Sequence, residues 1–163
     1  MLKQIFITSV IVFLLTGCNT DSNSNKKTAG SEPPQLDRGS SLIETDDSQD
    51  GIRDDIKNYI IENYPDERQK NALLQDAKAV QAILLVDIND KEAVRKADEQ
   101  DSRAIHCIFS VFDEKKDTEN PSIVSDKILS MTTNTKERLQ AYLAFNKALE
   151  GTVATLPEGD TCE

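Results

Sequence analysis

The 163-residue sequence lacks tryptophan and contains a single histidine, His106. One histidine excludes a zinc site built from several histidines of this chain. The sequence also lacks the HExxH and GxSxG motifs and any glycine-rich phosphate-binding loop. Aromatic residues make up only 5% of the chain, which leaves little for stacking on sugars or bases. These absences predict a protein that is not an enzyme.

Long apolar runs are absent apart from residues 5–15, and a run of that length is too short to span a bilayer, which takes about 20 apolar residues. Lys3 precedes the run, and small residues follow it and lead into Cys18. A positive start, an apolar middle and a small-residue end are typical of a secretory signal. We therefore expect residues 1–17 to be a signal peptide.

Four residues at the end of this run, Leu15-Thr16-Gly17-Cys18, resemble the lipobox of bacterial lipoproteins, Leu-[Ala/Ser/Thr]-[Gly/Ala]-Cys. The resemblance implies processing by the lipoprotein machinery, with diacylation of the Cys18 thiol and removal of the residues before it. Two or more acyl chains form a stable membrane anchor. Because Asn19 rather than Asp follows the cysteine, the resemblance implies sorting to the outer membrane, facing the periplasm. The periplasmic face of the inner membrane is the alternative.

Basic residues are outnumbered, with 19 Lys and Arg against 29 Asp and Glu. Removal of Lys3 with the signal leaves 18 against 29, a formal charge of −11. Such a chain is repelled by nucleic-acid phosphates and by anionic headgroups. We therefore expect no nucleic-acid partner, but an unidentified envelope protein with a basic or neutral surface.

Only three cysteines are present, and the lipobox uses Cys18, which leaves Cys107 and Cys162. In an exported protein an even remainder predicts one disulfide. Two free thiols, buried or reactive, are the alternative. A disulfide between them would attach the C-terminal tail to the rest of the domain.

Residues 18–45 contain the lipidated cysteine and a stretch rich in Ser, Asn, Thr, Gly and Pro without apolar periodicity, which predicts a disordered tether. From residue 46 to residue 163 we expect one helical periplasmic domain. Apolar residues at helical spacing predict helices over residues 52–64, 66–86, about 91–112, a shorter segment from Pro121 and a segment opened by Asn134 and Glu137 as a capping box. No segment alternates with period two, so the fold class is all-α, a small bundle of four or five helices.

The predicted inner faces include several residues near the C-terminus. Ile123, Val124, Ile128 and Leu129 form the stripe of the fourth helix. The fifth carries Leu139, Tyr142, Leu143, Asn146 and Leu149, and Phe109 belongs to the stripe of the third. These stripes predict that most of the aromatic rings lie in the core.

The segment from Asp46 to Asp55 resembles the acidic calcium loops of EF-hands, dockerins and thrombospondin type 3 repeats, D-x-[DNS]-x-[DN]-G-x-x-D. Ca²⁺ prefers six to eight oxygen ligands, and a turn at a glycine aims alternate side chains inward. The resemblance implies ligands at Asp46, Ser48, Asp50 and Asp54 and at the carbonyl of Ile52. At the twelfth position, where an EF-hand has Glu, this chain has Lys57. The alternative is that Asp50 caps the first helix and that the following glycine makes its turn.

Two further patterns are weaker indications of chemistry. His106 lies next to Cys107, but neighbours on a helix point about 100° apart, so we expect a structural or solvent-facing histidine. Two acid pairs, Glu62 with Asp66 and Asp98 with Asp101, have the minimum composition for a glycosidase, although such pairs arise by chance among 29 acids.

The sequence therefore predicts a membrane-anchored periplasmic lipoprotein that acts as a non-catalytic binding or assembly module. One form of such a module is similar in architecture to the secretin pilotins, which are also small, helical, disulfide-bearing and lipidated. The alternatives are a calcium-binding helical lipoprotein and a hydrolase directed at the cell wall. We expect no cofactor unless the acidic loop binds calcium.

Overall fold

Five α-helices form the secondary structure of the residues that the computed structural model describes, which are 34–43, 45–112, 119–153, 155 and 157–163. The helices are α1 Asp54–Asn63, α2 Glu67–Leu85, α3 Lys91–Val111, α4 Pro121–Thr132 and α5 Lys136–Ala148. No strand occurs in this part of the chain, so the all-α prediction is confirmed. The predicted signal peptide, the predicted lipidation site Cys18 and residues 19–33 lie outside the described residues.

Side-chain caps determine where four of the helices begin. Asp66, Asp90 and Asn120 each accept hydrogen bonds from the first free N–H groups of α2, α3 and α4. The predicted capping box of α5 is wrong, because Thr135 and not Asn134 accepts the bond from the Arg138 N–H. The side chain of Asn134 instead contacts two arginines.

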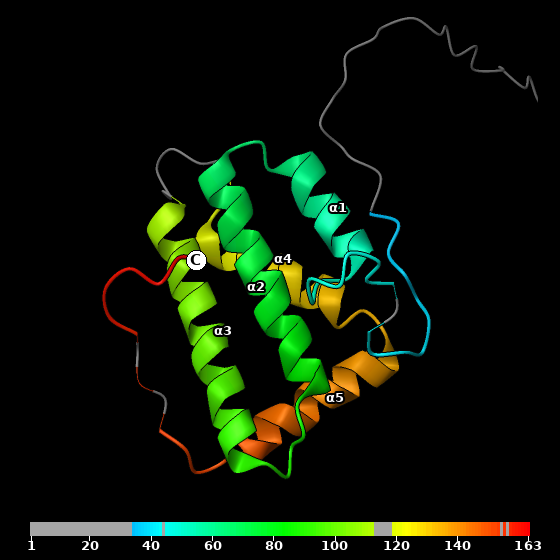
Figure 1. The fold of residues 1–163 in the computed structure, drawn as a ribbon, viewed down its shortest axis with the longest axis vertical. Helices are drawn as coiled ribbons and strands as arrows, with labels where there is room; N and C mark the ends of the chain where they lie inside the picture. The colour runs from blue at the N-terminus through cyan, green and yellow to red at the C-terminus, as the bar shows by residue number, and fades with distance from the viewer. Residues whose placement is uncertain (1–33, 44, 113–118, 154, 156) are drawn as a thin grey trace, which may run out of the picture. The chain divides into compact units, whose positions relative to one another are not determined.

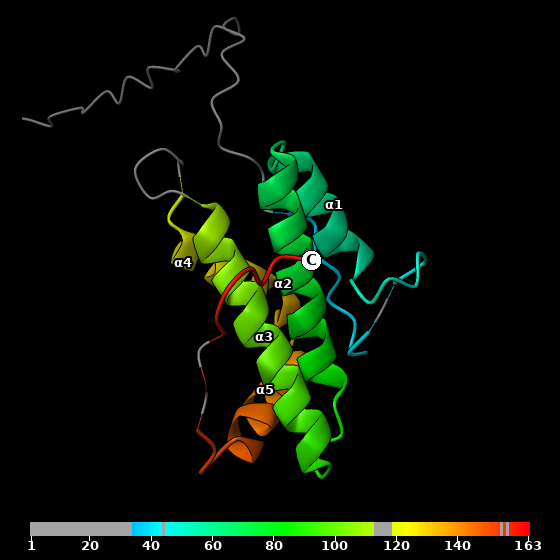
Figure 2. The ribbon, with the colours of Figure 1, turned by 60° about the vertical axis from the view of Figure 1, so that its left-hand side comes forward.

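The longest helices, α2 and α3, run side by side in opposite directions through a short turn (Figures 1 and 2). α1 lies beside the N-terminal half of α2, and α4 packs on α2 behind it. α5 crosses the C-terminal part of α2 near the start of α3. None of the described helices is both long and apolar enough to cross a membrane.

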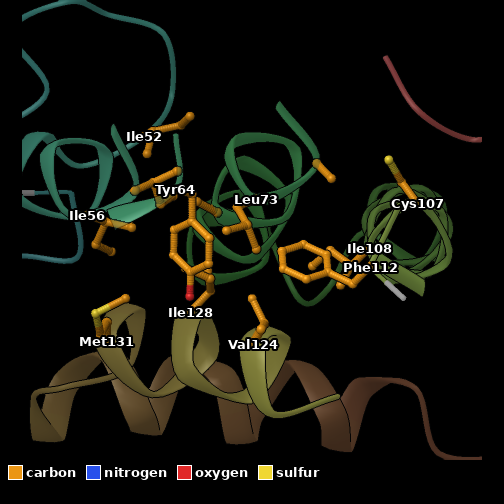
Figure 3. Close-up of a cluster of buried hydrophobic side chains, with 13 residues drawn as sticks. Ile52, Ile56, Tyr64, Leu73, Cys107, Ile108, Phe112, Val124, Ile128 and Met131 are labelled. Atoms are coloured by element: carbon orange, nitrogen blue, oxygen red, sulfur yellow. The ribbon is translucent and has the colours of Figure 1, made fainter. Parts of the chain in front are cut away.

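The larger apolar core lies where α1, the first half of α2, the last half of α3 and α4 meet. Figure 3 shows Val124, Ile128 and Met131 of α4 pointing towards Tyr64 and Leu73, with the remaining side chains arranged around them. Each fully buried Ile or Leu contributes about 1.5–3 kcal/mol to stability. A smaller cluster joins α5 to the other end of the α2 and α3 pair and consists of Ile83, Val94, Ala97 and Phe145.

Several apolar side chains expected in the core are exposed instead. Leu143 is 56% exposed, Leu139 45% and Phe109 50%, and Ile123 is also on the surface. The reason is that α5 turns Arg138 and Phe145 inward, which places its two leucines on the other side. Tyr142 and Leu149 of the predicted inner face do pack against the smaller cluster, whereas Leu139, Leu143 and Asn146 are exposed, so the prediction is correct for the helix and for part of its inner face.

Candidate functional site

Two fully buried arginines form the most extensive polar arrangement in the described chain. Arg53 precedes α1 and is 1% exposed, and Arg138 lies in the first turn of α5 and is 0% exposed. Buried arginines require partners, because an unpaired buried charge is costly. The partners come from residues 34–43, here called the N-terminal arm, from the first turn of α1 and from the turn before α5.

Arg138 holds the N-terminal arm through its whole guanidinium group. Its Nη2 donates to Asp37 Oδ2 at 2.8 Å, and its Nη1 donates to the Asp37 carbonyl at 3.1 Å. Its Nε donates to the Ser41 carbonyl at 3.1 Å. Asn134 completes the arrangement, because its Nδ2 donates to the Asp37 carbonyl at 2.7 Å while its Oδ1 accepts from Arg138 Nη1 at 2.7 Å.

Arg53 connects this arrangement to the start of α1. Its Nε and Nη2 donate to the two carboxylate oxygens of Asp55, at 3.0 and 2.6 Å, and Asp55 Oδ2 also accepts the N–H of Asp37 at 2.7 Å. The pKa of Asp37 lies below its ordinary value, chiefly because the Gly39 N–H donates to the carboxylate and also because Arg138 does. Asp37 is thus held as an anion in contact with both helices.

The docked N-terminal arm corrects the predicted extent of the tether. The sequence predicts a disordered tether up to residue 45, but Leu36 packs against the main core and the Leu42 carbonyl accepts from buried Gln81 at 2.9 Å. Residues 34–43 therefore belong to the folded unit, which the sequence predicted to begin at residue 46. The polar composition that predicts disorder did not reveal these contacts, because their partners lie far along the chain, 39 residues away for Leu42 and 97 for Ser41.

The acidic loop brings its predicted ligands together, but each carboxylate already has a partner. Asp46 accepts from the N–H groups of Asp50 and Gly51, at 3.2 and 2.9 Å, and Asp54 Oδ2 accepts from the N–H of Asp47 at 3.1 Å. Asp50 Oδ1 accepts from the N–H of Ile52 at 3.1 Å, which closes a turn before the helix. The predicted cap is wrong, because the N-cap of α1 is Arg53 and no side chain caps this helix. Gly51 makes the turn with φ of 86°.

Lys57 places a positive charge within this loop. Its Nζ pairs with Asp50 Oδ2 and donates to Ser48 Oγ at 3.1 Å. The pKa of Lys57 is raised, mainly by the hydrogen bond to Asp50 and further by the charges of Asp54 and Asp46. In the described chain no group of three or more acidic, His or Cys side chains is arranged to hold a metal. Calcium binding stays a prediction. In this arrangement the ion could bind only if the ammonium group of Lys57 moved away from Asp50 and Ser48.

Replacement of Lys57 by Glu is expected to raise the Ca²⁺ affinity of the loop at least roughly tenfold. The change removes the competing ammonium and supplies the carboxylate that EF-hands carry at this position. Calorimetric titration with Ca²⁺ measures the affinity, and Lys96→Glu, on the exposed face of α3, gives the same charge change as a control. Equal Ca²⁺ affinity of the native protein and Lys57→Glu would show that Lys57 does not oppose the ion.

A disulfide joins Cys107 of α3 to Cys162, as the sequence predicted, with a Cα to Cα distance of 5.0 Å. Hydrogen bonds also attach the C-terminal tail, near Cys162, to α2 and α3. Gln75 Nε2 donates to the carbonyl of the buried Thr161 at 2.9 Å, and His106 Nδ1 lies 3.2 Å from the Thr161 hydroxyl oxygen. His106 thus has the structural role expected for it, and its partner is the C-terminal tail.

Sequence reasoning missed a buried carboxyl group, Asp76 of α2, which is 1% exposed. Neither of its side-chain oxygens has a hydrogen-bond partner among the described residues. Burial, and next the charge of Asp101, raise the pKa of Asp76 to about 8, an effect that the nearby Ser125 partly offsets. A signal was present, because Asp76 lies three residues after Leu73 and four before Val80 on the apolar stripe of α2.

The acids considered for a hydrolase lie in different surroundings. Glu62 is exposed, and Asp66 caps α2. Asp101 is largely buried, and burial raises its pKa to about 6. A cavity of about 520 Å³ between α3 and the C-terminal tail is lined by Asp98 but not by Asp76 or Asp101.

Comparisons with known proteins identify no relative. No protein-family model, no curated protein and no solved structure matches this chain.

Proposed function

We propose that this protein is a lipid-anchored lipoprotein of the outer membrane whose helical domain is a non-catalytic binding or assembly module facing the periplasm. The observation that carries the proposal is the lipobox-like segment Leu15-Thr16-Gly17-Cys18 at the end of a short apolar run. The folded unit that follows it supports this assignment, because a lipoprotein of this kind needs a tether and then a stable domain.

The anchor would act by confining the domain near one membrane. With the N-terminal arm docked, residues 19–33 remain as the tether, and by their polar composition they would reach roughly 20 Å on average. Confinement raises the effective concentration of the domain towards a partner in the same membrane. The formal charge of −11 after processing favours an envelope protein with a basic or neutral surface.

Replacement of Cys18 by Ala is expected to abolish acylation and to move the protein from the membrane fraction to the soluble fraction. Metabolic labelling with a palmitate analogue, followed by fractionation of the envelope, measures both effects. The variant Cys107→Ser with Cys162→Ser is the matched control, because it removes two cysteines and should keep the label. A native protein that takes up no label would contradict the anchor.

Cross-linking in intact envelopes tests the binding role. A photo-reactive residue at exposed Leu143 of α5 or Phe109 of α3 should give discrete products with one envelope protein, identified by mass spectrometry. The same residue at exposed Lys96 serves as the control for proximity alone. Release of fragments from purified cell wall, lost when a single acid is replaced, would contradict the non-catalytic role.

A further inference from the structure

A buried carboxyl group, Asp76 of α2, lies near a partly buried one, Asp101 of α3. On α3, Asp101 lies between Ala97 of the smaller cluster and Cys107 of the larger one. On the neighbouring α2, Asp76 lies among residues of the larger cluster. Because α2 and α3 run side by side in opposite directions (Figure 1), these two positions face the same part of the bundle, and the charge of Asp101 acts on the carboxyl group of Asp76.

No base among the described groups compensates this pair. α3 contributes the carboxyl of Asp98 as the next charge near Asp101, and α4 contributes the hydroxyl of Ser125. α5 packs against the smaller cluster through Phe145, and its buried Arg138 is bound to the N-terminal arm. α1 contributes apolar residues to the larger cluster. Two negative charges at this position would repel each other at low dielectric.

We propose that Asp76 and Asp101 together retain a proton in the folded protein, and that loss of this proton at rising pH weakens the packing of α3 against α2. The geometry supports this, because a neutral carboxyl group tolerates burial without partners far better than a carboxylate does. The bundle therefore contains a proton-dependent element that is independent of the lipid anchor.

The sign of the effect follows from the raised pKa values. Asp76 has a pKa of about 8 in the fold and 3.8 as its ordinary value, and the pKa of Asp101 is raised to about 6. The unfolded chain loses these protons first, so the stabilising contribution is complete below about pH 4 and is lost as the pH rises towards 8. The carboxyl groups with lowered pKa values, such as that of Asp37, change the stability of the fold only at acidic pH, where they become protonated.

The test is the folding equilibrium constant of the purified protein, measured by urea unfolding between pH 5 and pH 8.5. We expect a fall of at least roughly 100-fold in the native protein across this range, and a much smaller fall in Asp76→Asn. Asp126→Asn, at an exposed position of α4, should behave like the native protein. Because histidine ordinarily titrates near neutrality, the series is repeated with His106→Gln. A native protein whose constant stays level over this range would overturn the proposal.

A second measurement does not depend on whether Asp76→Asn folds. In native protein with ¹³C-labelled aspartate, the carboxyl resonances of Asp76 and Asp101 should titrate above pH 5 and stay coupled. Hydrogen exchange in the middle of α2 and α3 should accelerate over the same range. Carboxyl resonances that all titrate below pH 5 would overturn the proposal.

Discussion

Replacement of Arg138 by Ala is expected to lower the free energy of unfolding by about 3–5 kcal/mol and to release the N-terminal arm. Removing one partner of a buried ion pair is strongly destabilising, and this side chain also fills space in a packed interior. Four hydrogen bonds disappear with it, three of them to the arm. Urea unfolding of the native and variant proteins measures the loss.

Release of the N-terminal arm has its own readout, because Arg38 is exposed and lies within the arm. Trypsin should cut after Arg38 much faster in Arg138→Ala, giving a fragment that begins at Gly39. Arg138→Lys should restore only part of the stability, since Lys cannot reproduce the planar set of donors. Coupling between Arg138→Ala and Asp37→Ala in a double-mutant cycle then isolates the contact at 2.8 Å.

Arg95→Ala is the matched control for this prediction. Arg95 pairs with Glu92 and Glu99 at 3.6 Å, and all three side chains are more than half exposed. Exposed pairs of this kind contribute about 0–1 kcal/mol. Equal losses for Arg95→Ala and Arg138→Ala, or unchanged trypsin cleavage at Arg38, would contradict the assigned role of the arm.

Replacement of Cys107 and Cys162 by Ser is expected to lower the free energy of unfolding by about 4 kcal/mol. The disulfide closes a loop with a sequence separation of 55 residues, and the chain-entropy model assigns a contribution of this size to such a loop. The hydrogen bonds of Thr161 with Gln75 and His106 do not replace the covalent constraint. Urea unfolding with and without reductant measures the effect.

The reductant serves as an internal control for the disulfide. It should destabilise the native protein by a similar amount and leave the double Ser variant unchanged. Hydrogen exchange should show that the released segment is the C-terminal tail, with faster exchange at Thr161 and Cys162. Native protein that is alkylated at both cysteines before any reduction would show that the thiols are free.

The helices of this protein follow from short-range features of the sequence. The predicted segment 66–86 became α2, Glu67–Leu85, and the fourth helix begins at Pro121 as expected. Caps such as Asp66 and Asp90 act on N–H groups two or three residues away. The pairing of Cys107 with Cys162 could also be predicted, because only one pair remains if Cys18 is assigned to the lipobox-like segment.

The candidate sites depended on contacts that no local pattern contains. Arg138 and Asp37 are 101 residues apart, and the burial of Arg138 is what turns Leu139 and Leu143 of α5 outward. The sequence did not show that the ammonium group of Lys57 lies within the acidic loop, where its Nζ donates to Ser48 nine residues away. The position of a residue on its own helix does not determine which side chains surround it, because those side chains come from the other helices that pack against it.

The sequence by itself determined the helices, the single cysteine pair and the lipobox-like start, because each depends on neighbouring residues or on a count. Only the tertiary structure decided that the N-terminal arm docks, that Arg53 and Arg138 are buried, and that Asp76 is buried within reach of the charge of Asp101. The physical reason is that the burial of a polar group is determined by the partners that surround it, and in this fold those partners come from distant parts of the chain.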